Sequence, residues 1–172
     1  MRNLLSLVFT MAVVTNSQAA TRPVDAASIV GEIRDVGAKR VVAKYYDTKA
    51  WEHSIMPGIR RADQAWLQVA EELHKGSDAG ASEDLDSALY EALPAAPYKV
   101  LPVMQRMYGR TLEDICTMTF EAETPKGGVA AYLRRTERGL ANPKTKQEIE
   151  SAKLCGRGLT KTREYAKANG LK

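Results

Sequence analysis

Histidine is scarce in this chain, and its scarcity narrows the chemistry that the protein can perform. The two histidines, His53 and His74, fall on different predicted helices and lack the spacing of paired metal ligands. A hydrolytic triad would need one of them beside a serine in a Gly-x-Ser-x-Gly turn, and the sequence contains no such turn. A glycine-rich phosphate loop is absent as well. We therefore expect a protein without a metal site, a cofactor or enzymatic activity.

Carboxylates alone can cleave glycosidic bonds, so a hydrolase built on acidic residues is the one enzymatic alternative. Its candidate residues are Glu71, Glu72, Glu83 and Asp84. Acids in such positions also serve helix capping and solubility, because the helix dipole favours negative charge in the first turn. Their placement therefore gives little support for an active site.

The sequence has only two cysteines, Cys116 and Cys155, and no Cys-x-x-Cys motif that would indicate a redox pair. An even number of cysteines in an exported protein is typical of a disulfide. Because only one pairing is open to them, we predict a structural Cys116–Cys155 bridge that closes a loop of about 40 residues.

Apolar runs of membrane-spanning length are missing too. The run from Leu4 to Val14 covers about 11 residues, well short of the ~20 that a spanning helix needs. It follows Arg2 and precedes small residues around Ala19, which is the three-part layout of a cleavable secretory signal. We therefore assign residues 1–19 to a signal peptide and residues 20–172 to one mature domain, located in the periplasm.

Charge is distributed unevenly along the chain. From Asp63 to Leu93 there are eight acids against one base, and from Lys126 to Lys172 there are twelve bases against four acids. The basic segment has only Tyr132 and Tyr165 to stack on bases, so a nucleic-acid partner is not expected. Each charged run is most simply a solvated helix face. The alternative is a bipolar protein that steers toward a charged partner.

Apolar residues recur at helical rather than alternating spacing along nearly the whole chain. We predict an all-α single domain of about seven to eight short helices, packed as irregular helical hairpins with one disulfide. Asp63 should cap a helix that places Trp66 in the core. Pro57 should kink or divide the helical segment whose apolar positions are Trp51, Ile55, Met56 and Ile59. The stretch 111–120 is ambiguous between helical and extended structure.

Other helix boundaries follow from capping residues and prolines. Ser82 is predicted to cap a helix, and residues 76–81 before it form a loop by composition. Pro97 and Pro102 should bracket a short helix. The last helix should begin near Pro143.

A longer pattern surrounds the predicted loop. The pattern Trp-Leu-x-Val-Ala-x-x-Leu-x-x-Gly-x-Asp-Ala-Gly-x-Ser-Glu runs from Trp66 to Glu83, and Ala92-Leu93-Pro94 follow. In these residues the chain resembles an uncharacterised family of small secreted α-helical proteins of proteobacteria. The resemblance covers residues 38–120. It implies a helical fold and a location outside the cytoplasm, but no activity. In size, export, helicity and single disulfide, the chain is also similar in general terms to periplasmic immunity proteins that neutralise cell-wall amidase toxins.

These observations favour binding over catalysis. The leading interpretation is a periplasmic protein-binding module, of which an immunity-type inhibitor of an envelope-directed toxin or enzyme is one form. Its expected contact surface carries Asp78, Glu83 and Asp84, which could enter a basic cleft of a protein partner. The alternative is an envelope-maintenance protein whose basic C-terminal helix contacts anionic membrane or peptidoglycan. The residues that would make this contact are Lys153, Arg157, Lys161 and Lys167.

Overall fold

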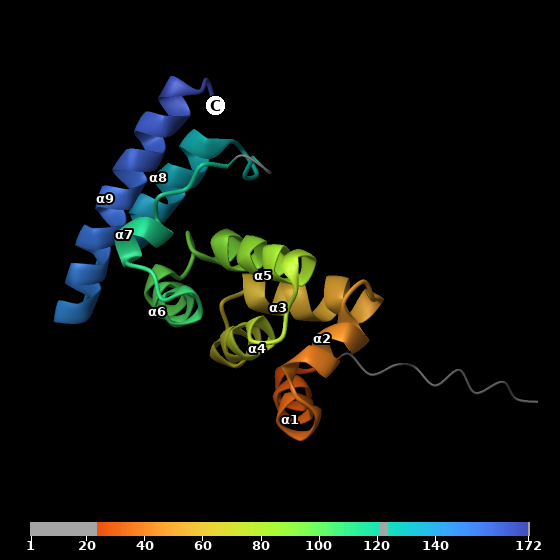
Figure 1. Ribbon diagram of the computed structural model, residues 1–172. Coiled ribbons are helices and arrows are strands. Elements are labelled where there is room, and N and C mark those ends of the chain that lie inside the picture. The colour runs from red at the N-terminus through yellow and green to blue at the C-terminus, as the bar shows by residue number, and fades with distance from the viewer. Residues whose placement is uncertain (1–23, 121–123, 172) are drawn as a thin grey trace, which may run out of the picture.

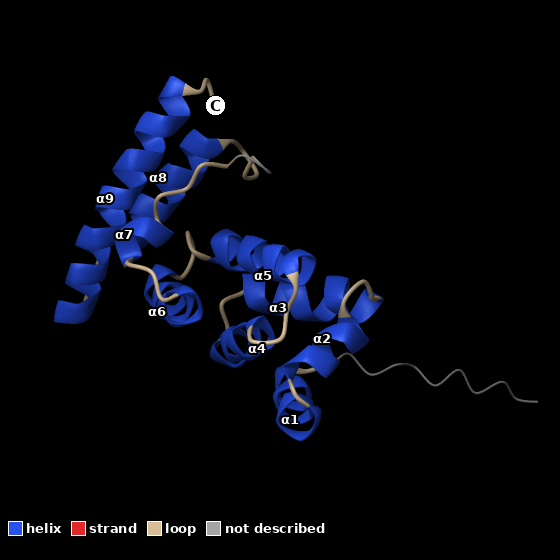
Figure 2. Cartoon of the chain, in the orientation of Figure 1, coloured by secondary structure: helices blue, strands red, loops and turns tan. Residues whose placement is uncertain are grey.

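The computed structural model describes residues 24–120 and 124–171, and all regular structure in these residues is helical (Figure 2). The predicted all-α single domain with one disulfide is confirmed. The predicted signal peptide lies outside the described residues. The elements are α1 (Ala26–Val36), α2 (Ala38–Tyr45), a π-helical turn η1 (Trp51–Ile55), α3 (Met56–Arg60), α4 (Gln64–His74), α5 (Ala79–Ala92), α6 (Pro97–Tyr108), α7 (Leu112–Ile115), α8 (Val129–Leu140) and α9 (Lys146–Ala168).

Helix α6 joins two parts of the molecule. Figure 1 shows α1–α5 gathered on one side and α7, α8 and α9 on the other, with α6 between them. Helix α6 contacts α4 and α5 in the first group and α7, α8 and α9 in the second. Buried apolar side chains from both groups form a single hydrophobic core. The two parts therefore belong to one folding unit.

Trp66 lies in this core, as its spacing predicts, and is only 9% exposed. Its ring packs against Gly58 of α3, where an added Cβ would approach the Trp66 Cγ to 2.7 Å. Asp63 holds the N-cap position of α4, but its side chain makes no capping hydrogen bond, so that detail of the prediction is wrong. The Asp63 carboxylate instead lies 3.5 Å from Arg61 Nε, because a nearby cation competes with the helix amides for it.

Two prolines, Pro57 and Pro102, lie inside helical segments of the structure. Pro57 lies in the first turn of α3, directly after the junction with the π-helical η1, and the helical backbone continues through it. Pro102 lies inside α6, and the prediction that it ends a helix is wrong. A proline removes one backbone hydrogen bond. In α6 this loss is offset because Leu101 and Val103, on either side of Pro102, are buried in the core.

Helix α9 begins at Lys146, three residues later than Pro143 predicts. Thr145 and Glu148 form a reciprocal capping box: Glu148 N donates to Thr145 Oγ1 and Thr145 N donates to Glu148 Oε2, both at 3.1 Å. The box satisfies two backbone donors at once, so it determines the helix start more strongly than the proline does.

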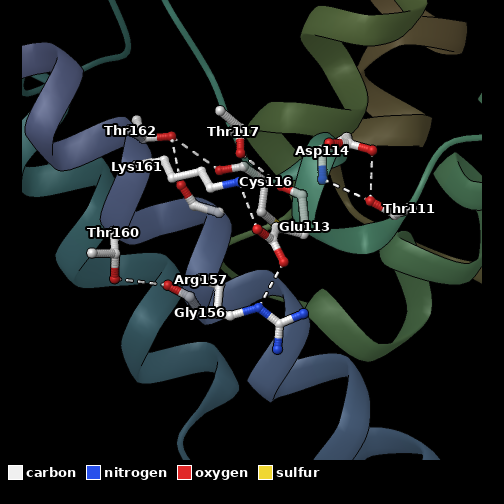
Figure 3. A network of polar contacts seen from close by, with 11 residues as sticks. Thr111, Glu113, Asp114, Cys116, Thr117, Gly156, Arg157, Thr160, Lys161 and Thr162 are labelled. Carbon is white, nitrogen blue, oxygen red and sulfur yellow. Dashed lines mark hydrogen bonds and ion pairs between the residues drawn. The ribbon is translucent and has the colours of Figure 1, made fainter.

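A disulfide and a buried threonine hold α7 against α9. Cys116 and Cys155 form the predicted bridge, with Cα atoms 5.1 Å apart, and both are fully buried. Thr162 Oγ1 donates to Cys116 O at 3.0 Å (Figure 3). It also accepts a hydrogen bond from Met118 N at 2.8 Å. The ambiguous stretch thus resolves into the short helix α7 followed by non-helical backbone at 117–120.

Candidate functional site

The connection between α4 and α5 is shorter than its composition predicts. Asp78 caps α5 by accepting a hydrogen bond from Ala81 N at 3.2 Å, so the helix already begins at Ala79. Of the predicted loop 76–81, only residues 76–78 lie outside the helices. The prediction that Ser82 caps the helix is wrong. The Ser82 hydroxyl instead lies 2.8 Å from the hydroxyl of Ser77, which donates to His74 O. These bonds fix the short loop between two rigid helix ends.

The three acids predicted to contact a partner lie at the start of α5 but differ in their own contacts. Asp78 is the helix cap. Asp84 Oδ2 accepts a hydrogen bond from Trp51 Nε1 at 2.8 Å, which ties α5 to η1. Glu83 is exposed and has no hydrogen bond or ion pair with the described residues. Two of the three carboxylates therefore stabilise the fold while remaining at its surface.

The segment between α2 and η1 brings two further residues, Tyr46 and Asp47, to the same place. The Tyr46 ring meets the Trp51 ring edge to face, with centroids 5.5 Å apart. Its hydroxyl packs against Gly80 of α5, where a Cβ would collide with it. A Cβ at this close approach of α5 would therefore displace the Tyr46 hydroxyl.

Four carboxylates act on the Tyr46 hydroxyl. Burial raises the pKa of this hydroxyl, and the negative charges of Asp47, Asp84, Asp78 and Glu83 raise it further. We call Tyr46 and these four acids the acidic surface. Sequence reasoning missed Tyr46 and Asp47, because the spacing of Tyr46 indicates only an apolar helix position. The arrangement concentrates negative charge near one partly exposed tyrosine, which is suited to a cationic side chain.

A separate polar cluster on α5 surrounds Asp86. The Tyr108 hydroxyl donates a hydrogen bond to the Asp86 carboxylate, and the His74 ring meets the Tyr108 ring edge to face at 5.6 Å. Burial raises the pKa of Asp86. His74 is therefore a packing residue of α4. His53 lies elsewhere, exposed on η1, 3.9 Å from Glu52. Within the described residues, no group of three or more ligands suited to a metal ion occurs.

The carboxylates of the hydrolase alternative are distributed over different contacts. Arg106 donates to both oxygens of Glu71 at 2.8 Å, and these bonds lower the pKa of Glu71. Glu72 accepts from Lys75 Nζ at 2.7 Å. Glu71 and Glu72 thus take part in ion pairs, whereas Glu83 and Asp84 belong to the acidic surface.

The basic C-terminal helix is partly neutralised by α7. Arg157 Nε and Lys161 Nζ each lie 2.6 Å from an oxygen of Glu113 (Figure 3). Lys153 lies 4.0 Å from Glu150. Of the four cations predicted to contact a membrane, only Lys167 has no ion pair with the described residues. None of the described helices is both long enough and apolar enough to cross a membrane.

These ion pairs make stability depend on pH. Hydrogen bonds from Lys161 and Arg157 lower the pKa of Glu113 from 4.5. Such a carboxyl contributes stability above its unfolded pKa, and this stability is lost as pH falls through the folded pKa. We expect Glu113→Gln to lower Tm at neutral pH, and the difference from the parent to shrink progressively as pH falls below about 4.5.

Thermal unfolding followed across pH tests this expectation. Glu150→Gln is the matched control, because Glu150 is exposed and its partner is 4.0 Å away. The control should change Tm little at any pH. A Tm loss in Glu113→Gln that stayed constant into acid would show that lost packing, and not charge, is its cause.

Comparison with known proteins provides no family for this chain: no protein-family model, no curated protein and no solved structure matches it. The functional argument therefore depends on the contacts and charges described above.

Proposed function

We propose that this protein is a periplasmic binding module whose acidic surface docks on a basic region of a protein partner. An inhibitor of the immunity type, directed at an envelope toxin or enzyme, is the form of this function that we favour. One observation carries the proposal: Asp78, Glu83 and Asp84 lie together at the start of α5, where the Trp51 indole, whose ring contacts Tyr46, donates to Asp84.

Two carboxylates of the acidic surface are held in place by hydrogen bonds, which favours binding. The indole of Trp51 holds Asp84, and the cap interaction with Ala81 N holds Asp78. Side chains that are ordered before binding lose less conformational entropy when a partner docks. Clustered like charges also steer an oppositely charged partner and raise its association rate at low salt.

The membrane alternative has less support. Its proposed contact needs four free cations on α9, and Arg157 and Lys161 both pair with Glu113. Releasing them to lipid would break these pairs. We therefore favour the protein-binding function.

Neutralising the acidic surface should slow association without changing the fold. The triple variant Asp78→Asn, Glu83→Gln and Asp84→Asn keeps each side-chain shape. Asparagine is also a good helix cap, and its amide oxygen can still accept from the Trp51 indole. We expect association with the partner to slow by roughly ten-fold or more at low salt, with a smaller effect at high salt.

The partner is first captured from a periplasmic extract on the immobilised protein. Its association kinetics are then measured with the parent and with the triple variant. The matched control neutralises three exposed acids elsewhere: Asp63→Asn, Glu150→Gln and Glu164→Gln. It removes the same charge and should associate nearly as fast as the parent. If the partner binds the triple variant as fast as the parent, the acidic surface is not the interface.

A further inference from the structure

A groove of about 700 Å³ lies at the corner between α1 and α2, against the end of α4. Its apolar lining includes Ile33, Val36 and Ala38. Val36 is 41% exposed and is one of two large apolar side chains exposed among the described residues. The groove therefore holds apolar surface in contact with water, which an occupant would cover.

The charged lining of the groove has an excess of positive charge. Glu72 and Lys75 form an ion pair at 2.7 Å and neutralise each other. Lys39 and Arg40 are exposed and have no ion pair or hydrogen bond with the described residues. Two unpaired cations thus remain beside the apolar lining.

Gly76 connects the groove to the acidic surface. It lines the groove by packing directly on α2, where an added Cβ would lie 2.7 Å from Lys39 Cα. Two residues later, Asp78 caps α5 and belongs to the acidic surface. One short loop, residues 76–78, therefore links two surface regions of opposite charge.

We infer that the groove binds a short protein segment in which an apolar side chain is flanked by carboxylates. Lys39 and Arg40 complement the carboxylates, and Val36 complements the apolar side chain. The inference rests on the proposed function and deepens it, because one partner can engage both regions across the short loop. Such a partner presents a basic region to the acidic surface and an acidic, apolar segment to the groove.

Three model peptides test the groove and the acidic surface separately. The probe for the groove is Glu-Leu-Glu-Leu-Glu, and Glu-Gly-Glu-Gly-Glu tests whether the apolar side chain matters. The probe for the acidic surface is Lys-Leu-Lys-Leu-Lys. Binding to the mature chain is located by NMR shifts of the backbone amides. We expect the first peptide to shift the amides of Val36, Lys39 and Gly76. The second peptide should have an affinity lower than that of the first by roughly five-fold or more. The lysine peptide should shift those of Gly80 and Asp84.

Substitutions on the groove should weaken only the acidic, apolar peptide. Lys39→Gln with Arg40→Gln, and separately Val36→Ser, should each reduce its affinity by roughly five-fold or more at low salt. The charge control is Lys99→Gln with Lys146→Gln, both exposed and distant in sequence from the groove. The apolar control is Ile149→Ser, since Ile149 is the other exposed large apolar residue and is 55% exposed. Both controls should bind like the parent.

Three results would overturn the inference. They are unchanged affinity in the groove variants, peptide shifts located on α9 instead of the groove, and displacement of the peptide from the groove by vesicles of anionic lipid. The last result would assign the groove to a membrane surface. If the lysine peptide did not shift the amides of Gly80 and Asp84, the result would contradict the proposed function alone. That peptide does not report on the groove.

Discussion

Replacing Cys116 and Cys155 together by alanine should reduce the free energy of unfolding by about 4 kcal/mol. The bridge joins residues separated by 39 positions. A cross-link of that span restricts the unfolded chain, and the folded state gains relative stability. Both cysteines are fully buried, so the alanine variant also loses some packing at the contact of α7 with α9. For a domain of this size, Tm should fall by roughly 10 °C or more.

Reduction of the parent separates the two contributions. The reduced parent keeps both sulfur atoms and loses only the covalent link, so it should melt between the oxidised parent and the double variant. Thermal unfolding of all three forms provides the measurement. Unfolding of the oxidised and reduced parents at the same temperature would show that the bridge adds no stability.

The sequence predicts the helices better than it predicts their ends. Helical spacing correctly identifies the core position of Trp66 and the all-α fold, because burial of an apolar stripe is a local property of the sequence. The predicted start of α5 is wrong because Asp78 and Ser82 are both good caps, and only the structure shows which one accepts a hydrogen bond from a free amide. The prediction that Pro102 ends a helix is wrong because burial of the neighbouring Leu101 and Val103 offsets the lost backbone hydrogen bond.

The candidate site was predicted only in part, for a related reason. The acids at the start of α5 are visible as a run in the sequence. The Trp51–Asp84 hydrogen bond spans 33 residues and depends on the packing of α3, which directly follows η1, against α5. No local pattern encodes this packing. The same limit applies to the basic helix, because the run of cations on α9 does not reveal that Glu113 pairs with two of them.

The substitution Gly158→Ala should destabilise the protein, although alanine is a better helix former than glycine. An added Cβ would lie 2.8 Å from both the carbonyl carbon and the Cβ of Cys116, and closer still to the Glu113 carbonyl oxygen. These are mostly backbone atoms of α7, and the disulfide and Thr162 hold α7 in place, so they cannot easily move away. Overpacking of this kind costs about 1–3 kcal/mol, which exceeds the roughly 0.5–1 kcal/mol that alanine contributes in a helix.

Gly156 is the matched control for this prediction, since it lies two residues earlier on the same continuous helix (Figure 3). A Cβ there would meet no atom within 4 Å. Gly156→Ala should therefore gain about 0.5–1 kcal/mol, while Gly158→Ala loses about 1–2 kcal/mol. Urea unfolding of both variants measures the difference, and a larger residue such as valine at position 158 should increase the loss. If both alanine variants were stabilised equally, α7 would have to move away from α9 at little cost, and the close contact at Gly158 would not determine how these helices pack.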